Sequence, residues 1–216
     1  MADKLRIFNQ SLRLLKERKL ASLSENREPR RLLDEAWGDG STNGSVRRCL
    51  ELGQWTFATR AVQIDYSPSI DPSFGYRYAF DRPSDMVKVA AVCSDEYFNN
   101  PLLQYVDEGD YWYADLQTIY VRYVSNGSTY GTDLSRWPVS FEDLVAADLA
   151  FEIVGNLTQG ESDISRVDKI RTRALTRARS NDAMNKPTAF TPTGRWIGAR
   201  RGNINRGHNR GGGWSV

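Results

Sequence analysis

The chain has 216 residues, of which 40% are hydrophobic and 26% charged, enough to bury a core of its own. It contains no apolar run long enough to span a membrane, and Asp3, Lys4 and Arg6 interrupt its first ten residues, so neither a span nor a signal peptide is predicted. Cys49 and Cys93 are far apart and are expected to be reduced thiols, as in a cytosolic protein.

Three helices are predicted in the first sixty residues. Apolar residues three and four apart predict a helix over residues 2–18. Pro29 suits the first turn of a second helix, which we expect to end before the glycine-containing run 38–44. Ser45 is predicted to cap a third helix, whose apolar positions at helical spacing extend to Phe57.

The pattern changes to β-structure between about residues 60 and 135, where Tyr, Val, Ile and Pro become frequent. Residues 118–124 alternate between two faces, and Tyr111–Tyr113 precedes them across a short link, so the two segments predict a β-hairpin. Further candidate strands are shorter: Val62–Tyr66, Met86–Val92 and Gln104–Val106.

Two more helices are predicted after Trp137. Ser140 is expected to cap a helix that runs to about Leu157 and is apolar enough to be buried in a bundle. The last helix spans about Ser162–Ala183, and its basic face is typical of a solvated surface. The chain is therefore predicted to be an α+β protein, a helical bundle (residues 1–60 and 137–183) that carries a β-rich insert (61–136) and an extended C-terminal arm (184–216).

The arm is the most unusual segment in composition. Residues 186–216 contain six basic residues and no acidic one, whereas residues 1–185 have four more acidic than basic residues. The segment has no apolar periodicity, yet its aromatic side chains are costly to leave in water. We expect it to become ordered on an acidic surface, either nucleic acid or protein. The candidate contact residues are Phe190, Arg195, Trp196, Arg200, Arg201, Arg206, Arg210 and Trp214.

No catalytic, cofactor or metal site is predicted. His208 is the one histidine, and it lies in the arm without a partner for acid–base or zinc chemistry. Asp107, Glu108 and Asp110 fall in a glycine-containing turn, where acidic residues are favoured as turn and solvent residues. Together with Trp112 this turn is a candidate contact for another protein, and the alternative is that both faces of the predicted hairpin are internal.

Seven short motifs occur in a fixed order over roughly residues 5–183. They are Phe8-x3-Leu12-x2-Leu15, the segment 18–30, Leu50-x4-Trp55-x-Phe57-Ala58, the segment 75–85, Ile119–Tyr123, Trp137-Pro138-x2-Phe141 and Asn156-Leu-Thr158. In this order they resemble the tail tubular protein A family, the head–tail adaptors of short-tailed phages. Each motif is weak alone, and the specificity lies in the ordered set.

The resemblance implies a structural role without catalysis or cofactor. Twelve copies would form a ring beneath the portal protein in the neck of the virion, after synthesis in the host cytoplasm. The tail nozzle would attach below, and genomic DNA would pass through the lumen without specific binding. The arm would then bind the portal, and Asp107, Glu108, Asp110 and Trp112 would contact the nozzle or a neighbouring subunit. A nucleic-acid-binding protein that uses the basic arm remains the alternative.

Overall fold

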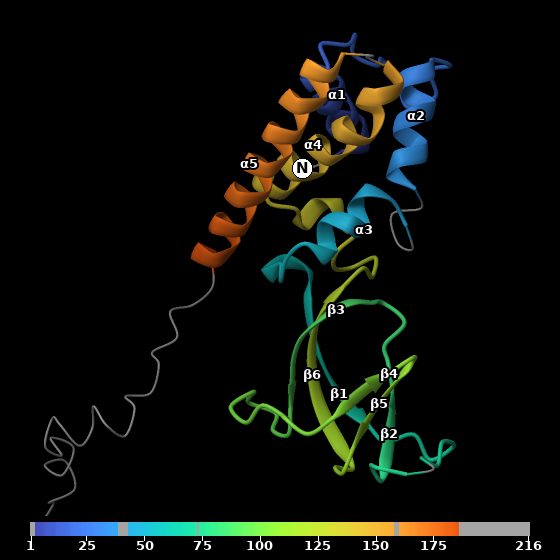
Figure 1. Ribbon diagram of the computed structural model, residues 1–216, viewed down its shortest axis with the longest axis vertical. Coiled ribbons are helices and arrows are strands. Elements are labelled where there is room, and N and C mark those ends of the chain that lie inside the picture. The colour runs from blue at the N-terminus through green and yellow to red at the C-terminus, as the bar shows by residue number, and fades with distance from the viewer. Residues whose placement is uncertain (1–2, 39–42, 73, 158–159, 186–216) are drawn as a thin grey trace, which may run out of the picture. The chain divides into compact units, whose positions relative to one another are not determined.

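The computed structural model describes residues 3–38, 43–72, 74–157 and 160–185, and the chain has the predicted α+β fold (Figure 1). The described helices are α1 (Lys4–Leu14), α2 (Glu28–Trp37), α3 (Gly44–Glu51), α4 (Val139–Leu157) and α5 (Glu161–Asn185). The strands are β1 (Thr59–Asp65), β2 (Tyr78–Asp81), β3 (Met86–Cys93), β4 (Val106–Glu108), β5 (Tyr111–Ala114) and β6 (Thr118–Ser125). All six therefore lie between α3 and α4 in the sequence. The first two residues of the predicted arm, Met184 and Asn185, belong to α5, and residues 186–216 lie outside the described residues.

Helix α4 is the centre of the helical part. It packs against α1, α2, α3 and α5, and Figure 1 shows α5 and α2 on opposite sides of it. Because it has neighbours on all sides, apolar residues recur around its whole circumference and even its alanines are buried. The expected burial of this helix is confirmed.

Aromatic rings close the bundle where the chain leaves it and returns to it. The Phe141 ring lies 5.1 Å from the Trp55 ring and 4.9 Å from the Trp137 ring, both edge to face. The two indole N–H groups are satisfied by backbone, Trp55 donating to the Cys49 carbonyl and Trp137 to the Gly131 carbonyl, each over 2.9 Å. Edge-to-face contacts of this kind add to the stabilisation from buried area.

The prediction for the third helix was wrong at both ends. Asn43, and not Ser45, is the N-cap, and Ser45 is a buried residue inside the helix whose hydroxyl accepts a hydrogen bond from Arg48. The helix ends at Glu51, and Phe57 lies in a short 3-10 turn that leads into β1. Phe57 still packs on Phe141, at 4.8 Å, so its apolar character serves the core across a corner of the chain.

The strands form two three-stranded antiparallel sheets, in the orders β1-β6-β3 and β2-β5-β4. The predicted hairpin of β5 with β6 is therefore wrong, because the link between them carries the chain from one sheet to the other. Trp112 of β5 and Ile119 and Val121 of β6 then meet in one buried cluster. A hairpin and such a corner share the same alternation and the same short link, so their sequences look alike.

The other strand predictions had mixed outcomes. The candidates Val62–Tyr66 and Met86–Val92 correspond to β1 and β3, whereas Gln104–Val106 overlaps β4 only at Val106. Strand β2 was not predicted, since its four residues lie between a glycine and a proline that mark turns. The exact boundaries proposed for the bundle and the insert stay predictions.

A buried carboxylate joins three helices of the bundle. Asp148 of α4 is completely buried, and its oxygens lie 3.1 Å from Arg48 Nη2 of α3 and 2.8 Å from Arg171 Nε of α5. The Arg171 contact is ionic rather than a well-aligned hydrogen bond, because Asp148 Oδ1 accepts no hydrogen bond from the described residues. Both arginines are partly exposed, so each keeps some hydration while it compensates the buried charge.

A second polar cluster joins the strands to the turn before β3. Asp85 accepts hydrogen bonds from Ser125 Oγ at 2.5 Å, Tyr123 Oη at 2.9 Å and Arg60 Nη1 at 2.9 Å. Burial alone raises the pKa of this carboxyl, but the three hydrogen bonds outweigh burial and lower the pKa below its ordinary value of 3.8. The ionised form is therefore the one that stabilises the fold.

The lowered pKa of Asp85 leads to a pH-dependent prediction for Asp85→Asn. Because the folded-state pKa is depressed, the stabilisation is present above the unfolded-state pKa and is lost as the pH falls through the folded-state value. The variant should lose unfolding free energy relative to wild type at about pH 6, and the difference should shrink below about pH 3.8. Urea unfolding at both pH values measures this, with the exposed Asp71→Asn as control. An equal difference at the two pH values would contradict the role of ionisation.

Candidate docking surfaces

The described part of the chain ends with helix α5, and the predicted arm follows it. The arm residues Phe190, Arg195, Trp196, Arg200, Arg201, Arg206, Arg210 and Trp214, as well as His208, lie outside the described residues. Their assignment to portal binding stays a prediction. What the structure does show is the surface from which the arm starts.

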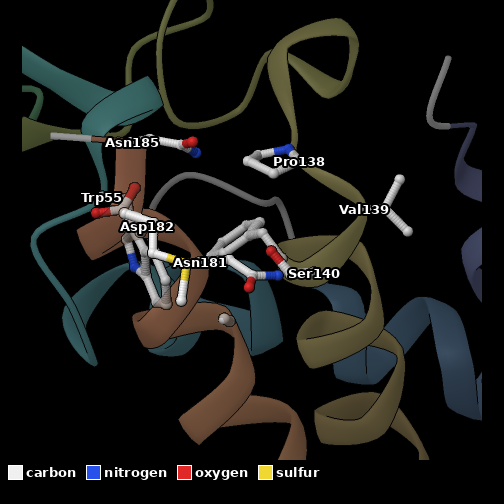
Figure 2. A pocket seen from close by; sticks show the side chains of 10 residues that line it. Trp55, Pro138, Val139, Ser140, Asn181, Asp182 and Asn185 are labelled. Carbon is white, nitrogen blue, oxygen red and sulfur yellow. The ribbon is translucent and has the colours of Figure 1, made fainter.

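A pocket of about 310 Å³ lies beside the last turns of α5. Figure 2 shows it between the end of α5, which contributes Asn181, Asp182 and Asn185, and the start of α4 at Pro138 and Val139. The ring of Trp55 lies at its buried side. The pocket therefore joins an apolar wall to a rim of amide and carboxyl groups, a mixture that suits a side chain of another protein segment.

The position of this pocket follows from local contacts. Asp182 is largely buried and accepts a hydrogen bond of 2.8 Å from the backbone N–H of Thr56, which fixes the end of α5 against the corner that leads into β1. Beside it, the side chains of Val139 and Met184 are 64% and 77% exposed. Sequence reasoning missed this site, because a valine and a methionine at the ends of helices carry no signal of exposure.

The acidic residues before β5 are exposed, as predicted, but Trp112 is not. Their predicted place in a turn is correct only for Asp110, because Asp107 and Glu108 belong to strand β4. Asp107, Glu108 and Asp110 are all at the surface, and Asp107 pairs with Arg82 at 3.2 Å. The Trp112 side chain is completely buried in the cluster between the sheets. Its proposed role as a contact residue is therefore corrected: the face of β5 that carries Trp112 is internal, and the aromatic residue belongs to the core.

Large apolar side chains are exposed in two other loops of the sheet part. Phe74 lies between β1 and β2 and is 92% exposed, while Tyr97 and Leu103 lie between β3 and β4 and are 75% and 86% exposed. Side chains of this kind on both the helical and the sheet part are candidate contacts with other proteins. The acidic turn adds charge to the sheet part but brings no second group into a reactive arrangement.

Chemically reactive groups do not converge in the described part of the chain. No group of three or more His, Cys, Asp or Glu side chains there has an arrangement that could hold a metal ion. Both described cysteines are buried free thiols, and burial raises the pKa of each. Among the described helices, none is long and apolar enough to cross a membrane.

The surfaces above are thus suited to protein contacts. No model of a known protein family matches the chain, and no curated protein matches it.

Proposed function

We propose that the chain is a non-catalytic head–tail adaptor of a short-tailed phage. Copies of it, twelve in the resembling family, would form a ring that joins the portal protein to the tail nozzle in the virion neck. DNA would pass through the lumen without specific binding. The proposal rests first on the ordered motifs that resemble tail tubular protein A.

The observation that carries the proposal is the distribution of exposed apolar side chains. Val139 and Met184 are exposed on the helical part, and Phe74, Tyr97 and Leu103 on the sheet part. An adaptor needs contact surfaces on more than one part, because it binds different proteins through each. A single-site binding protein would be served by one such surface.

The ordered core favours a body that folds before it assembles. The described part of the chain holds two buried clusters, one mostly among the helices and one between the sheets. The exposed apolar residues are scattered rather than joined in one large patch. A subunit of this kind is stable alone and assembles when a partner offers a template.

The test is assembly of the purified chain with the portal protein of the same phage. Light scattering should show a single subunit alone at low concentration, and electron microscopy should show a ring on the portal after mixing. A stable discrete dimer that ignores the portal would contradict the proposal. Tight binding of free DNA at physiological salt, without portal binding, would favour the nucleic-acid alternative instead.

A further inference from the structure

The backbone of the loop between β3 and β4 keeps the Tyr97 side chain exposed to solvent. Phe98 has φ of 58°, a left-handed conformation that a residue with a bulky side chain rarely adopts. Its ring lies beneath the guanidinium of Arg122, with Cζ 4.1 Å from the ring centroid. The turn thereby directs Phe98 inward, and the preceding Glu96 and Tyr97 remain exposed.

The same loop is held rigid by its first acidic residue. Asp95 accepts hydrogen bonds from the backbone N–H groups of Asn99 at 3.0 Å and Asn100 at 2.7 Å. Ser94 and Asn100 are also joined through the backbone, at 3.1 Å. A strained and internally bonded loop that exposes an aromatic ring is typical of a preorganised contact. We call Glu96 and Tyr97 the acidic knob.

A groove with the complementary character lies between α1, α4 and α5. Its volume is about 310 Å³, and its apolar lining consists of Leu14, Ile170 and Ala174. Three arginines surround this lining, Arg13 on α1 and Arg173 and Arg177 one turn apart on α5. None of the three forms an ion pair within the part of the chain that the structure describes, whereas Arg166, Arg171 and Arg179 are each bonded to neighbouring groups.

The part of the chain that carries the knob and the groove itself also differ in charge. Residues 59–125, which include the strands, contain ten acidic and five basic residues. The groove is lined by these three arginines and by one carboxyl, Asp143, which accepts a hydrogen bond from Gln10, so positive charge is in excess there. An acidic loop with one exposed aromatic side chain is complementary to this groove. The aromatic ring would fill the apolar floor, and the carboxylate of the loop would reach the arginines at the rim.

We propose that the acidic knob of one copy, Glu96 and Tyr97, docks in the arginine groove of the next copy, lined by Arg13, Arg173 and Arg177. The proposal rests on the ring-forming function inferred above. The two surfaces are different, so the contact is heterologous and repeats from copy to copy. Such a contact closes into a ring when the rotation from copy to copy adds up to a full turn, whereas a contact between identical surfaces stops at a dimer.

Cysteine cross-linking tests this contact in the full-length chain. A variant with both Asn99→Cys, an exposed position beside the knob, and Ala174→Cys, assembled on the portal and treated with a bifunctional thiol-reactive cross-linker, should give a ladder of cross-linked oligomers on a denaturing gel. The native Cys49 and Cys93 are buried and do not compete. A mixture of the two single variants should stop at dimers, because each copy then carries one half of the contact. Each single variant alone should give no ladder.

Charge reversal provides a second, independent measurement. Arg173→Glu with Arg177→Glu should raise the concentration needed for half-assembly by about tenfold or more, since two favourable charge contacts become repulsive. Arg18→Glu with Arg77→Glu makes the same change in net charge at exposed arginines outside the groove, and should leave assembly unchanged. Tyr97→Ala should also weaken assembly. Leu23→Ala, which shortens an exposed apolar side chain outside the knob and the groove, serves as its control and should leave assembly unchanged.

The outcomes separate this inference from the proposed function. Rings on the portal without the cross-linked ladder would overturn the knob-and-groove contact and leave the adaptor function standing. A cross-link from position 174 to the portal or nozzle, or loss of DNA binding alone in the arginine variant, would also overturn it. Failure of the wild-type chain to assemble at all would refute both.

Discussion

Removal of residues 186–216 should abolish portal binding while the remaining body keeps its fold and its melting temperature. The described body contains both buried clusters, and no residue of either lies beyond Ala178. Truncation therefore removes no residue of these two clusters. Circular dichroism of the truncated chain measures its stability, and cosedimentation with the portal measures binding.

The length of the arm explains why its removal is expected to abolish portal binding completely. Thirty-one extended residues span at most about 100 Å, enough to cross a neighbouring subunit and lie on the portal. Ordering them costs on the order of 1–2 kcal/mol per residue of backbone entropy. Buried anchors must offset this cost, and Trp196 and Trp214 are the largest side chains in the segment, each able to bury about 150–250 Å².

Substitutions within the arm distinguish the contribution of its tryptophans to portal binding from that of its arginines. Trp196→Ala with Trp214→Ala should weaken portal binding by more than any single Arg→Ala, because each buried aromatic anchor contributes about 2 kcal/mol or more. The arginines should instead set the salt dependence of binding. His208→Ala is the control inside the arm and should bind as wild type does. Normal docking of the truncated chain on the portal would refute the role of the arm.

The parts of the fold that the sequence predicted are those governed by local rules. Helical periodicity located the five helices, and Pro29 at the first turn of α2 confirmed its expected start. The apolar character of α4 correctly predicted that it is buried in the bundle. Alternation located β6 and the buried face that carries Ile119, Val121 and Tyr123.

The parts that were missed depend on contacts distant in sequence. Nothing local distinguishes a β5–β6 hairpin from a corner between two sheets, and the same ambiguity placed Trp112 at a surface when it fills the core. The groove is another example, because Arg13 and Arg173 are 160 residues apart and meet only through the packing of α1 and α5 around α4. On a helical wheel, Arg173 and the ion-paired Arg171 looked equally solvated.

The interior of the bundle offers the second prediction with a large effect, the substitution Asp148→Asn. The change is isosteric, so it removes one negative charge and no volume. It leaves Arg171 without this carboxylate, while Arg48 keeps its ion pair with Glu152 at 2.9 Å. Removing one partner of a buried ion pair typically costs about 3–5 kcal/mol when it leaves a buried charge uncompensated. We expect a smaller loss of about 2 kcal/mol here, because both arginines are partly exposed and Arg48 keeps Glu152 as a partner.

Glu51→Gln provides the matched comparison. It makes the same chemical change in an ion pair with Arg47 on α3, but Glu51 is 50% exposed, and surface pairs of this type contribute less than about 1 kcal/mol. Urea unfolding of both variants at neutral pH should therefore separate them clearly, with the midpoint shifted for Asp148→Asn alone and the slope unchanged. If the two variants lost equal stability, Asp148 would not join α3, α4 and α5 energetically, and the rigidity of the bundle would have to come from its aromatic contacts alone.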